Sequence, residues 1–400
     1  METYLLDWAN LLVRWIHLIT GVAWIGASFY FVMLDMSLRK AAKKADQQRG
    51  VSGELWAVHG GGVYQSQKFL SGPIGEPLSE NLHWSKWEAY STWLSGMGML
   101  IIIYWFGANT YLIDQTVLQL SVAQAISVSA LVIAISWLIY DLLCRFLGSN
   151  ENLLAALIFI YILLCDWILF QVFSARAAYI HVGAIMGSIM VANVFFHIIP
   201  GQKKMVQEIR AGLTPNPEYG RVGKQRSVHN TYFTLPVLFV MISNHYPMTY
   251  SHQYGWVVLA LIMMAGILIR QFFVLRHIHQ VKWWLPVVGI AFLAAVIVWL
   301  KPQSINADTL GTKVEFSEVK SIIDTRCISC HSDQPTQPGF MQPPKGIVLK
   351  QNSQISQHTT MISQTVGNQY MPIGNLTGMT AEERQVISSW FAQGAHVDLN

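Results

Sequence analysis

The residues with the clearest chemistry are Cys327, Cys330 and His331, in the run Cys-Ile-Ser-Cys-His. In such a C-x-x-C-H run the two thiols form thioether bonds to a haem, and the adjacent imidazole ligates its iron. A zinc knuckle or a redox dithiol also uses C-x-x-C, but zinc would need two more ligands. The region after the motif offers only His358 and His396 for that purpose. The histidine directly after the second cysteine favours the haem over zinc. The pattern therefore predicts one covalent haem c.

A methionine sulfur is the expected second axial ligand of the iron. Met371 follows His331 by 40 residues, and the proline after it restricts its loop. The Met-Pro-x-Gly run is similar to the ligand loop of many cytochromes c. The other methionines of the region, Met341, Met361 and Met379, remain alternative ligands.

Helices are predicted on both sides of the haem motif. Phe316, Val319 and Ile323 recur at helical spacing before it. Thr380 and Glu383 form a capping-box signature that opens a last helix. The apolar face of that helix should pack on the first helix and the haem. It is formed by Val386, Ile387, Trp390 and Phe391.

The composition indicates a membrane protein. Charged residues make up 12% of the chain and hydrophobic residues 52%, whereas about a quarter of the residues of a soluble domain are charged. Eight apolar stretches are close to the ~20 residues that cross a bilayer: 11–34, 88–107, 121–143, 152–172, 178–199, 230–245, 254–275 and 283–300. We expect an all-α fold, with an eight-helix transmembrane bundle in residues 1–300, a linker at 301–312 and a small class I cytochrome c domain in residues 313–400.

Basic residues are unequally divided between the two sets of loops. One set holds sixteen, and the other holds only Arg176 before the C-terminal domain. The richer set should be cytoplasmic, which puts both termini outside. Covalent haem is attached on the periplasmic side in bacteria, so both arguments predict a multi-pass inner-membrane protein with a periplasmic cytochrome c domain. The net charge of +4 reflects the cytoplasmic loops and indicates no nucleic-acid partner.

Histidines near the predicted spans form an outward and an inward layer. The outward layer holds His17, His181 and His245, and the inward layer includes His83 and His229. Ionisable residues inside spans are rare and usually functional. The outward layer supplies candidate ligands for a haem b, and the alternative is interfacial histidines bonded to backbone or lipid headgroups.

The spacing of the histidines raises one difficulty for such a haem. His181 and His197 are 16 residues apart, as are His229 and His245. Sixteen residues rise about 24 Å but turn about 160° beyond whole turns, so the two do not share a face. Pro236 can change the register of the second helix, but the first has no obvious equivalent.

Three longer stretches are more specific than the haem motif. They are residues 55–64 (Leu-Trp-Ala-Val-His-Gly-Gly-Gly-Val-Tyr), 82–96 (beginning Leu-His-Trp) and 229–247 (beginning His-Asn-Thr-Tyr). With eight spans and a C-terminal cytochrome c, they make the whole chain resemble the bacterial membrane-bound cytochrome c urate oxidase (urate hydroxylase) family. The resemblance implies oxidation of urate to 5-hydroxyisourate, with the hydroxyl oxygen from water. Electrons would pass to haem c and on to a soluble or membrane cytochrome c or a terminal oxidase, without peroxide.

This chemistry needs a base, because urate loses two electrons and two protons. The predicted catalytic set is His83, Glu88, His229 and Thr231, at one depth near the cytoplasmic mouth. His and Glu suit proton transfer, and Lys86 could offset the charge of urate. Glu88 and Lys86 could equally be helix-end charges that reach the interface. One haem c accepts one electron at a time, so sequential transfers or a further centre, the haem b, are required.

Two other functions remain open. A respiratory cytochrome subunit that oxidises quinol would also use membrane histidines and glutamates, without purine chemistry. A transporter with a redox-controlled C-terminal domain is the third possibility. Purine turnover by the purified protein separates the first function from both.

Overall fold

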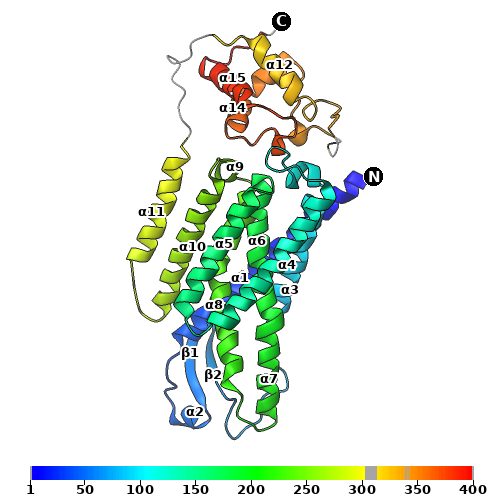
Figure 1. Cartoon of the computed structure of the whole chain (residues 1–400). Coiled ribbons are helices and arrows are strands. Elements are labelled where there is room, and N and C mark those ends of the chain that lie inside the picture. The colour runs from blue at the N-terminus through cyan, green and yellow to red at the C-terminus, as the bar shows by residue number, and fades with distance from the viewer. Residues whose placement is uncertain (1, 302–312, 338–339, 341, 399–400) are drawn as a thin grey trace.

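A computed structural model describes residues 2–301, 313–337, 340 and 342–398 of the chain. Long helices lie side by side in one bundle, with the C-terminal helices at one end (Figure 1). The helices of the bundle and its loops are α1 (Glu2–Ser37), α2 (Lys44–Gln48), α3 (Trp87–Met99), α4 (Val122–Leu147), α5 (Glu151–Phe170), α6 (Ala175–Ala192), α7 (Ile199–Arg210), α8 (Pro217–Ser243), α9 (Pro247–Tyr250), α10 (Gly255–His277) and α11 (Trp284–Trp299). Three π-helical segments interrupt or extend them: η1 (Leu100–Trp105), η2 (Ala108–Leu112) and η3 (Asn193–Ile198).

Five helices among the described residues are long and apolar enough to cross a membrane, and each overlaps one of the eight predicted spans. They are Tyr4–Ser37, Val122–Leu147, Glu151–Phe170, Ala175–Arg210 and Gly255–His277. The stretch predicted at 88–107 is helical as α3 and η1, and the stretch at 230–245 is the second half of α8. The last predicted span, α11, has 16 residues. These apolar helices are compatible with a membrane protein.

A β-hairpin in the first loop makes the all-α prediction incomplete. Strands β1 (Val51–His59) and β2 (Gly62–Phe69) pair antiparallel, with His59 opposite Gly62. The turn residues Gly60 and Gly61 both have positive φ angles, +57° and +81°. A two-residue turn of this type needs positive φ at both positions, which glycine adopts without strain. The Gly-Gly pair between two β-prone runs was the sequence signal for this hairpin.

Helix α6 lies at the centre of the bundle. Its side chains Tyr179, Val182, Ile185 and Ile189 are fully buried. It packs against α3, α4, α5 and α8. A Cβ atom on Gly183 would lie 2.6 Å from Val240 Cγ1, so the absence of a side chain there allows α8 to approach closely. Helix α6 therefore positions groups from several neighbouring helices.

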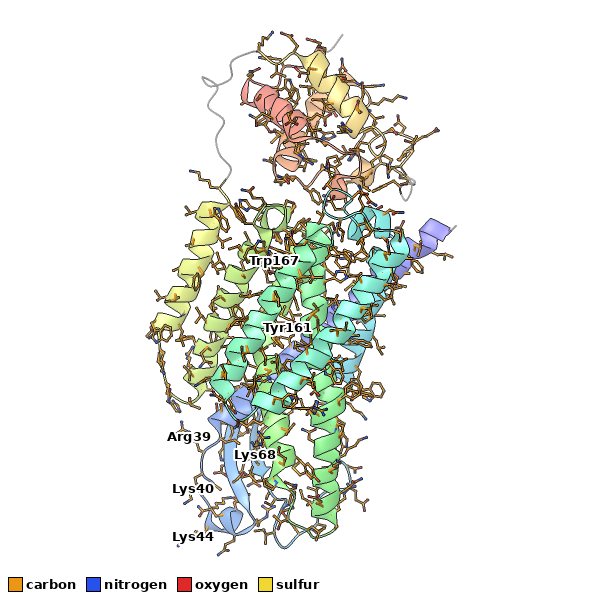
Figure 2. All side chains as sticks on the ribbon, viewed as in Figure 1. Arg39, Lys40, Lys44, Lys68, Tyr161 and Trp167 are labelled. Carbon is orange, nitrogen blue, oxygen red and sulfur yellow. The ribbon has the colours of Figure 1, made fainter. Side chains whose placement is uncertain are left out.

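The two ends of the bundle differ in charge. Basic side chains of the first loop, including Arg39, Lys40, Lys44 and Lys68, lie at the end opposite the C-terminal helices (Figure 2). The start of α1 lies toward the other end, near the C-terminal helices (Figure 1). This arrangement agrees with the predicted placement of both termini on one side and the basic loops on the other.

The C-terminal region forms a separate small helical unit with its own core. It contains α12 (Phe316–Arg326), α13 (Asn352–Gln357), α14 (Thr359–Gly367) and α15 (Ala381–Ala392), with short 3-10 turns η5 (Pro344–Gly346) and η6 (Ile373–Asn375). Phe316 and Val319 of α12 share a buried cluster with Ile387 and Trp390 of α15. The predicted capping box of α15 is confirmed, because the Thr380 side chain accepts from the Glu383 backbone and the reciprocal bond is present. Residues 302–312 of the predicted linker (301–312) lie outside the described residues.

Candidate functional site

The haem motif follows α12 in a tight turn. The backbone amides of Cys330 and His331 both donate to the Cys327 carbonyl, at 3.1 and 2.8 Å. The His331 Nδ1–H donates to the Ile347 carbonyl at 2.9 Å. A carbonyl only accepts, so the hydrogen is on Nδ1 and the Nε2 lone pair is free for a metal. This is the tautomer that an iron ligand needs.

Burial shifts the pKa values of His331 and Cys327 in this motif. It lowers the pKa of His331, which keeps the imidazole neutral and able to donate its lone pair. It raises the pKa of the Cys327 thiol to about 12. Two half-buried thiols and a correctly oriented imidazole on one turn fit a covalent haem c. Such a group would supply one-electron acceptance at this end of the molecule.

Met371, the predicted axial ligand, differs in burial from the other described methionines of this region. It lies half-buried in the loop between α14 and η6, where Arg384 Nη1 donates to its carbonyl at 2.7 Å. Met379 is only 3% exposed and belongs to the hydrophobic cluster of the region, whereas Met361 is 45% exposed on α14. Met341 lies outside the described residues.

Replacing Met371 by alanine should keep the attached haem but lower its reduction potential, on the order of tenths of a volt, because a thioether raises it. The sulfur-to-iron charge-transfer band should also disappear from the spectrum of the oxidised protein. Redox titration and absorbance spectroscopy measure both effects. An intact band would move the role to one of the other methionines.

The three outward histidines are held by different neighbours. His17 Nδ1 lies 2.9 Å from the Thr92 carbonyl on α3. His181 is fully buried, and its two ring nitrogens lie 2.7 Å from Ser129 Oγ and from the Ala177 carbonyl. His245 is exposed after α8. No contact joins any two of these three histidines among the described residues, so a haem b rests on the sequence alone.

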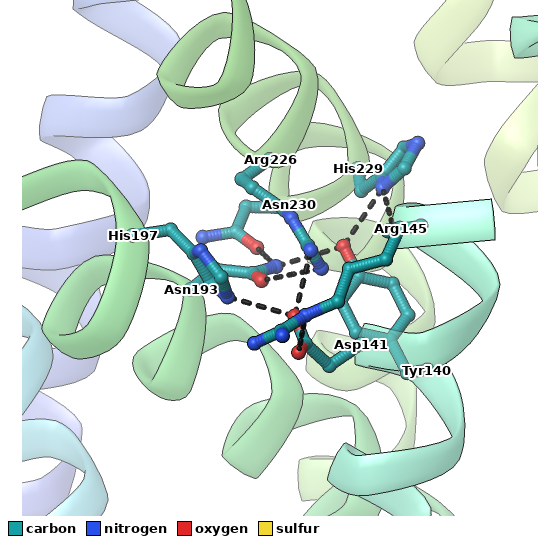
Figure 3. Close-up of polar contacts among 9 residues, drawn as sticks. Tyr140, Asp141, Arg145, Asn193, His197, Arg226, His229 and Asn230 are labelled. Atoms are coloured by element: carbon teal, nitrogen blue, oxygen red, sulfur yellow. Dashed lines mark hydrogen bonds and ion pairs between the residues drawn. The ribbon is translucent and has the colours of Figure 1, made fainter. Parts of the chain in front are cut away.

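A buried polar cluster joins α4, η3 and α8 (Figure 3). Its centre is Asp141, which is 4% exposed. The Asp141 carboxylate accepts from Arg145 Nε at 2.6 Å and from Arg226 Nη2 at 2.7 Å, and lies 2.7 Å from His197 Nε2. Arg226 is 2% exposed. A buried carboxylate requires such partners, because an unpaired charge is costly away from water.

Neutral groups extend this cluster across the bundle. The Tyr140 hydroxyl lies 2.7 Å from His229 Nδ1, and Asn193 Nδ2 donates to that hydroxyl at 2.9 Å. Asn193 also donates to Asn230 Oδ1 at 2.9 Å. A cavity of about 450 Å³ beside the cluster is lined partly by Arg145, Arg226 and His197.

The π-helical segment η3 supplies two members of the cluster, Asn193 and His197. A π-helix shifts the angular register of the residues that follow it, and such segments recur at functional sites. In an ideal helix the 16-residue spacing of His181 and His197 would place them on different faces. The π-helical segment changes the angle between them.

Residues 3–301 of the chain match a family model described as urate oxidase, N-terminal. This chain belongs to that family. The match covers the bundle and ends before the haem motif, and it indicates a urate-related oxidoreductase. A search of curated proteins found no match. A search of solved structures found none either.

Within this urate oxidase family member, no hydrogen bond or ion pair of the described residues joins any two of the four residues predicted as a catalytic set. His229 belongs to the polar cluster. His83 is exposed before α3, with no side-chain partner among the described residues. One carboxylate oxygen of Glu88 is buried without a partner. The Thr231 hydroxyl donates within its own helix, to the Ser227 carbonyl at 3.0 Å.

Sequence reasoning missed Asp141 as the centre of the cluster. Asp141 lies inside the predicted span 121–143, and a carboxylate within an apolar stretch is itself a signal of a polar site. The partner Arg226 comes from a distant part of the chain, so only the fold could connect them. Within the described residues no group of three or more His, Cys, Asp and Glu side chains is arranged to hold a metal ion.

Proposed function

We propose that this protein oxidises urate to 5-hydroxyisourate at the bacterial inner membrane and passes the electrons through a covalent haem c to the respiratory chain. The proposal rests on one combination: a bundle of the urate oxidase family is joined, in the same chain, to a haem-attachment motif. The free Nε2 of His331 supports the haem assignment, since its other ring nitrogen is bonded to Ile347.

The reaction balances without molecular oxygen. Urate and water give 5-hydroxyisourate, two electrons and two protons. A single haem c accepts one electron at a time, so two transfers follow each urate, with an external cytochrome c or terminal oxidase taking each electron onward. No hydrogen peroxide forms, because oxygen is not the oxidant at this site.

The distance between the polar cluster and the haem motif decides whether electrons could pass directly from one to the other. Of the four residues predicted as the catalytic set, His229 joins the polar cluster, where it pairs with Tyr140. That site and the haem motif lie toward opposite ends of α6 and its continuation. Arg176 and His197 lie on one continuous helix, and a rise of about 1.5 Å per residue puts roughly 30 Å between them. Electrons released at the predicted catalytic residues would therefore need an intermediate redox centre to reach the haem.

Urate should reduce the haem c of the purified protein without oxygen. Two haems should be reduced per urate consumed, because the oxidation releases two electrons. Anaerobic absorbance titration measures this, with dithionite giving the total haem. Reduction by a quinol and not by urate would instead support the quinol-oxidising alternative.

The membrane arrangement that we propose has eight spans, with the cytochrome c domain in the periplasm. It is supported by the basic side chains at the opposite end of the bundle (Figure 2). A tag on the C-terminus should be cut by protease added to spheroplasts, while a tag inserted in the β1–β2 turn should be protected. Protection of the C-terminal tag while an external control protein is cut would overturn this topology.

A further inference from the structure

A cavity of about 310 Å³ lies between the bundle and the loop that carries Met371. The bundle contributes Tyr111 of η2, Arg176 of α6 and Tyr250 of α9. The C-terminal region contributes Tyr370, next to Met371, and Arg384 of α15. The cavity is thus built from both parts of the chain, at the end that holds the haem motif (Figure 1).

The lining is cationic. Arg176 stacks on Tyr111, with 5.0 Å from the guanidinium carbon to the ring centroid, and its Nε is buried without a partner. Arg384 donates to the Val366 and Met371 carbonyls and forms no ion pair within the described residues. The only acidic residue of the lining is Asp114, whose Oδ1 already accepts from Thr116.

Two further features favour an anion. The N-terminus of α6 opens on the cavity, since Ser174 and Ala175 line it, and the positive end of a helix dipole attracts negative charge. The Tyr250 hydroxyl is buried without a partner, in a residue only 5% exposed. A buried hydroxyl without a hydrogen bond is costly, and a bound oxyanion would satisfy it.

The cavity borders the loop that carries the predicted iron ligand Met371, through the neighbouring residue Tyr370. A Cβ atom on Gly374 would lie 3.0 Å from the Thr110 carbonyl, so η6 touches the bundle here. An occupant of the cavity would therefore lie against the Met371 loop of the proposed haem domain.

From these contacts we infer that the cavity binds a planar organic oxyanion between the bundle and the Met371 loop. This inference rests on the proposed function, and urate is the occupant that the site favours. The urate anion is flat and its charge is delocalised, which suits two guanidinium groups and tyrosine ring faces. The volume is at the lower end of the range for small-molecule sites. A haem propionate is the other source of such an oxyanion.

The test compares Arg176→Gln with Arg210→Gln, an identical change on the exposed side of α7 at the opposite end. The Arg176 variant should raise the urate concentration for half-maximal haem reduction by about 10- to 100-fold, the loss expected for a hydrogen bond to a charged group. Its haem content and potential should stay unchanged. Arg176→Lys should recover part of the affinity, since it keeps the charge but not the planar fork. The Arg210 variant should match the wild type.

The other outcomes are equally decisive. A shifted potential with normal urate dependence would support the oxyanion site but identify its occupant as the haem propionate. Normal urate dependence and normal potential would overturn the inference, as would loss of urate saturation in His229→Asn but not in Arg176→Gln.

If Arg176→Gln fails to fold, Tyr250→Phe removes only the unpartnered hydroxyl and should weaken urate binding several-fold. Failure of urate to reduce the wild-type haem would instead refute the proposed function, and the oxyanion site would then be judged by the potential alone.

Discussion

Cells carrying Cys327→Ala should lose sustained urate consumption, down to background, while the bundle remains inserted in the membrane. Cys327 caps α12 and begins the turn that places Cys330 and His331. Without this thiol one thioether cannot form, and the electrons of urate lose their acceptor. Urate loss, peroxide formation and the amount of protein in the membrane are the measurements.

Cys165→Ala provides the matched control for this experiment. Cys165 is a buried cysteine of α5, remote in sequence from the haem motif, and acts as a small apolar side chain. Its replacement should leave urate consumption unchanged. Normal urate turnover with peroxide production in Cys327→Ala would show that oxygen, and not the haem, receives the electrons.

The second large effect is expected at Asp141. Asp141→Ala would leave Arg226 buried without its counter-charge, since Arg226 is 2% exposed. Removing one partner of a buried ion pair typically costs about 3–5 kcal/mol. The variant should therefore give little folded protein, and the remainder should unfold at a lower temperature. Thermal unfolding in detergent and size-exclusion profiles measure this.

A second variant and a control separate charge burial from simple loss of a side chain. Asp141→Leu combined with Arg226→Met removes both charges and should recover much of the stability, because apolar groups of similar volume replace a buried pair with little loss. Asp35→Asn breaks the half-exposed pair of Asp35 with Lys68 and should cost less than about 1 kcal/mol. Wild-type stability of Asp141→Ala would mean that the cluster does not hold the bundle together.

Local patterns in the chain predicted the features that depend on neighbouring residues. The haem motif is contiguous, and the tautomer of His331 in the structure fits its predicted role. The capping box of Thr380 and Glu383 spans one turn and was confirmed. Five of the predicted spans coincide with described helices that are long and apolar enough to cross a membrane, because the length and hydropathy of a helix are properties of a single segment.

The hairpin of the first loop also has a local signal in the sequence. Gly60 and Gly61 separate two runs of β-prone residues, and the positive φ angles of both define a hairpin turn. The hairpin could therefore have been predicted. Three further predicted spans are not among these five helices. At 283–300 the helix α11 has 16 residues, and at 88–107 and 230–245 the helices α3 and α8 carry several polar side chains that face other helices.

Sequence alone determined the chemistry at each position along the chain, including the thiols, the imidazole and the apolar segments. Only the tertiary structure decided which distant groups meet. In the π-helical segment η3, His197 contacts Asp141 and Asn193 contacts Tyr140, and no pattern in the chain indicated the change of register. Arg176 and Arg384 face one cavity although they belong to different parts of the chain. Burial and charge compensation act between such groups in three dimensions, so their pairing follows from packing and not from spacing.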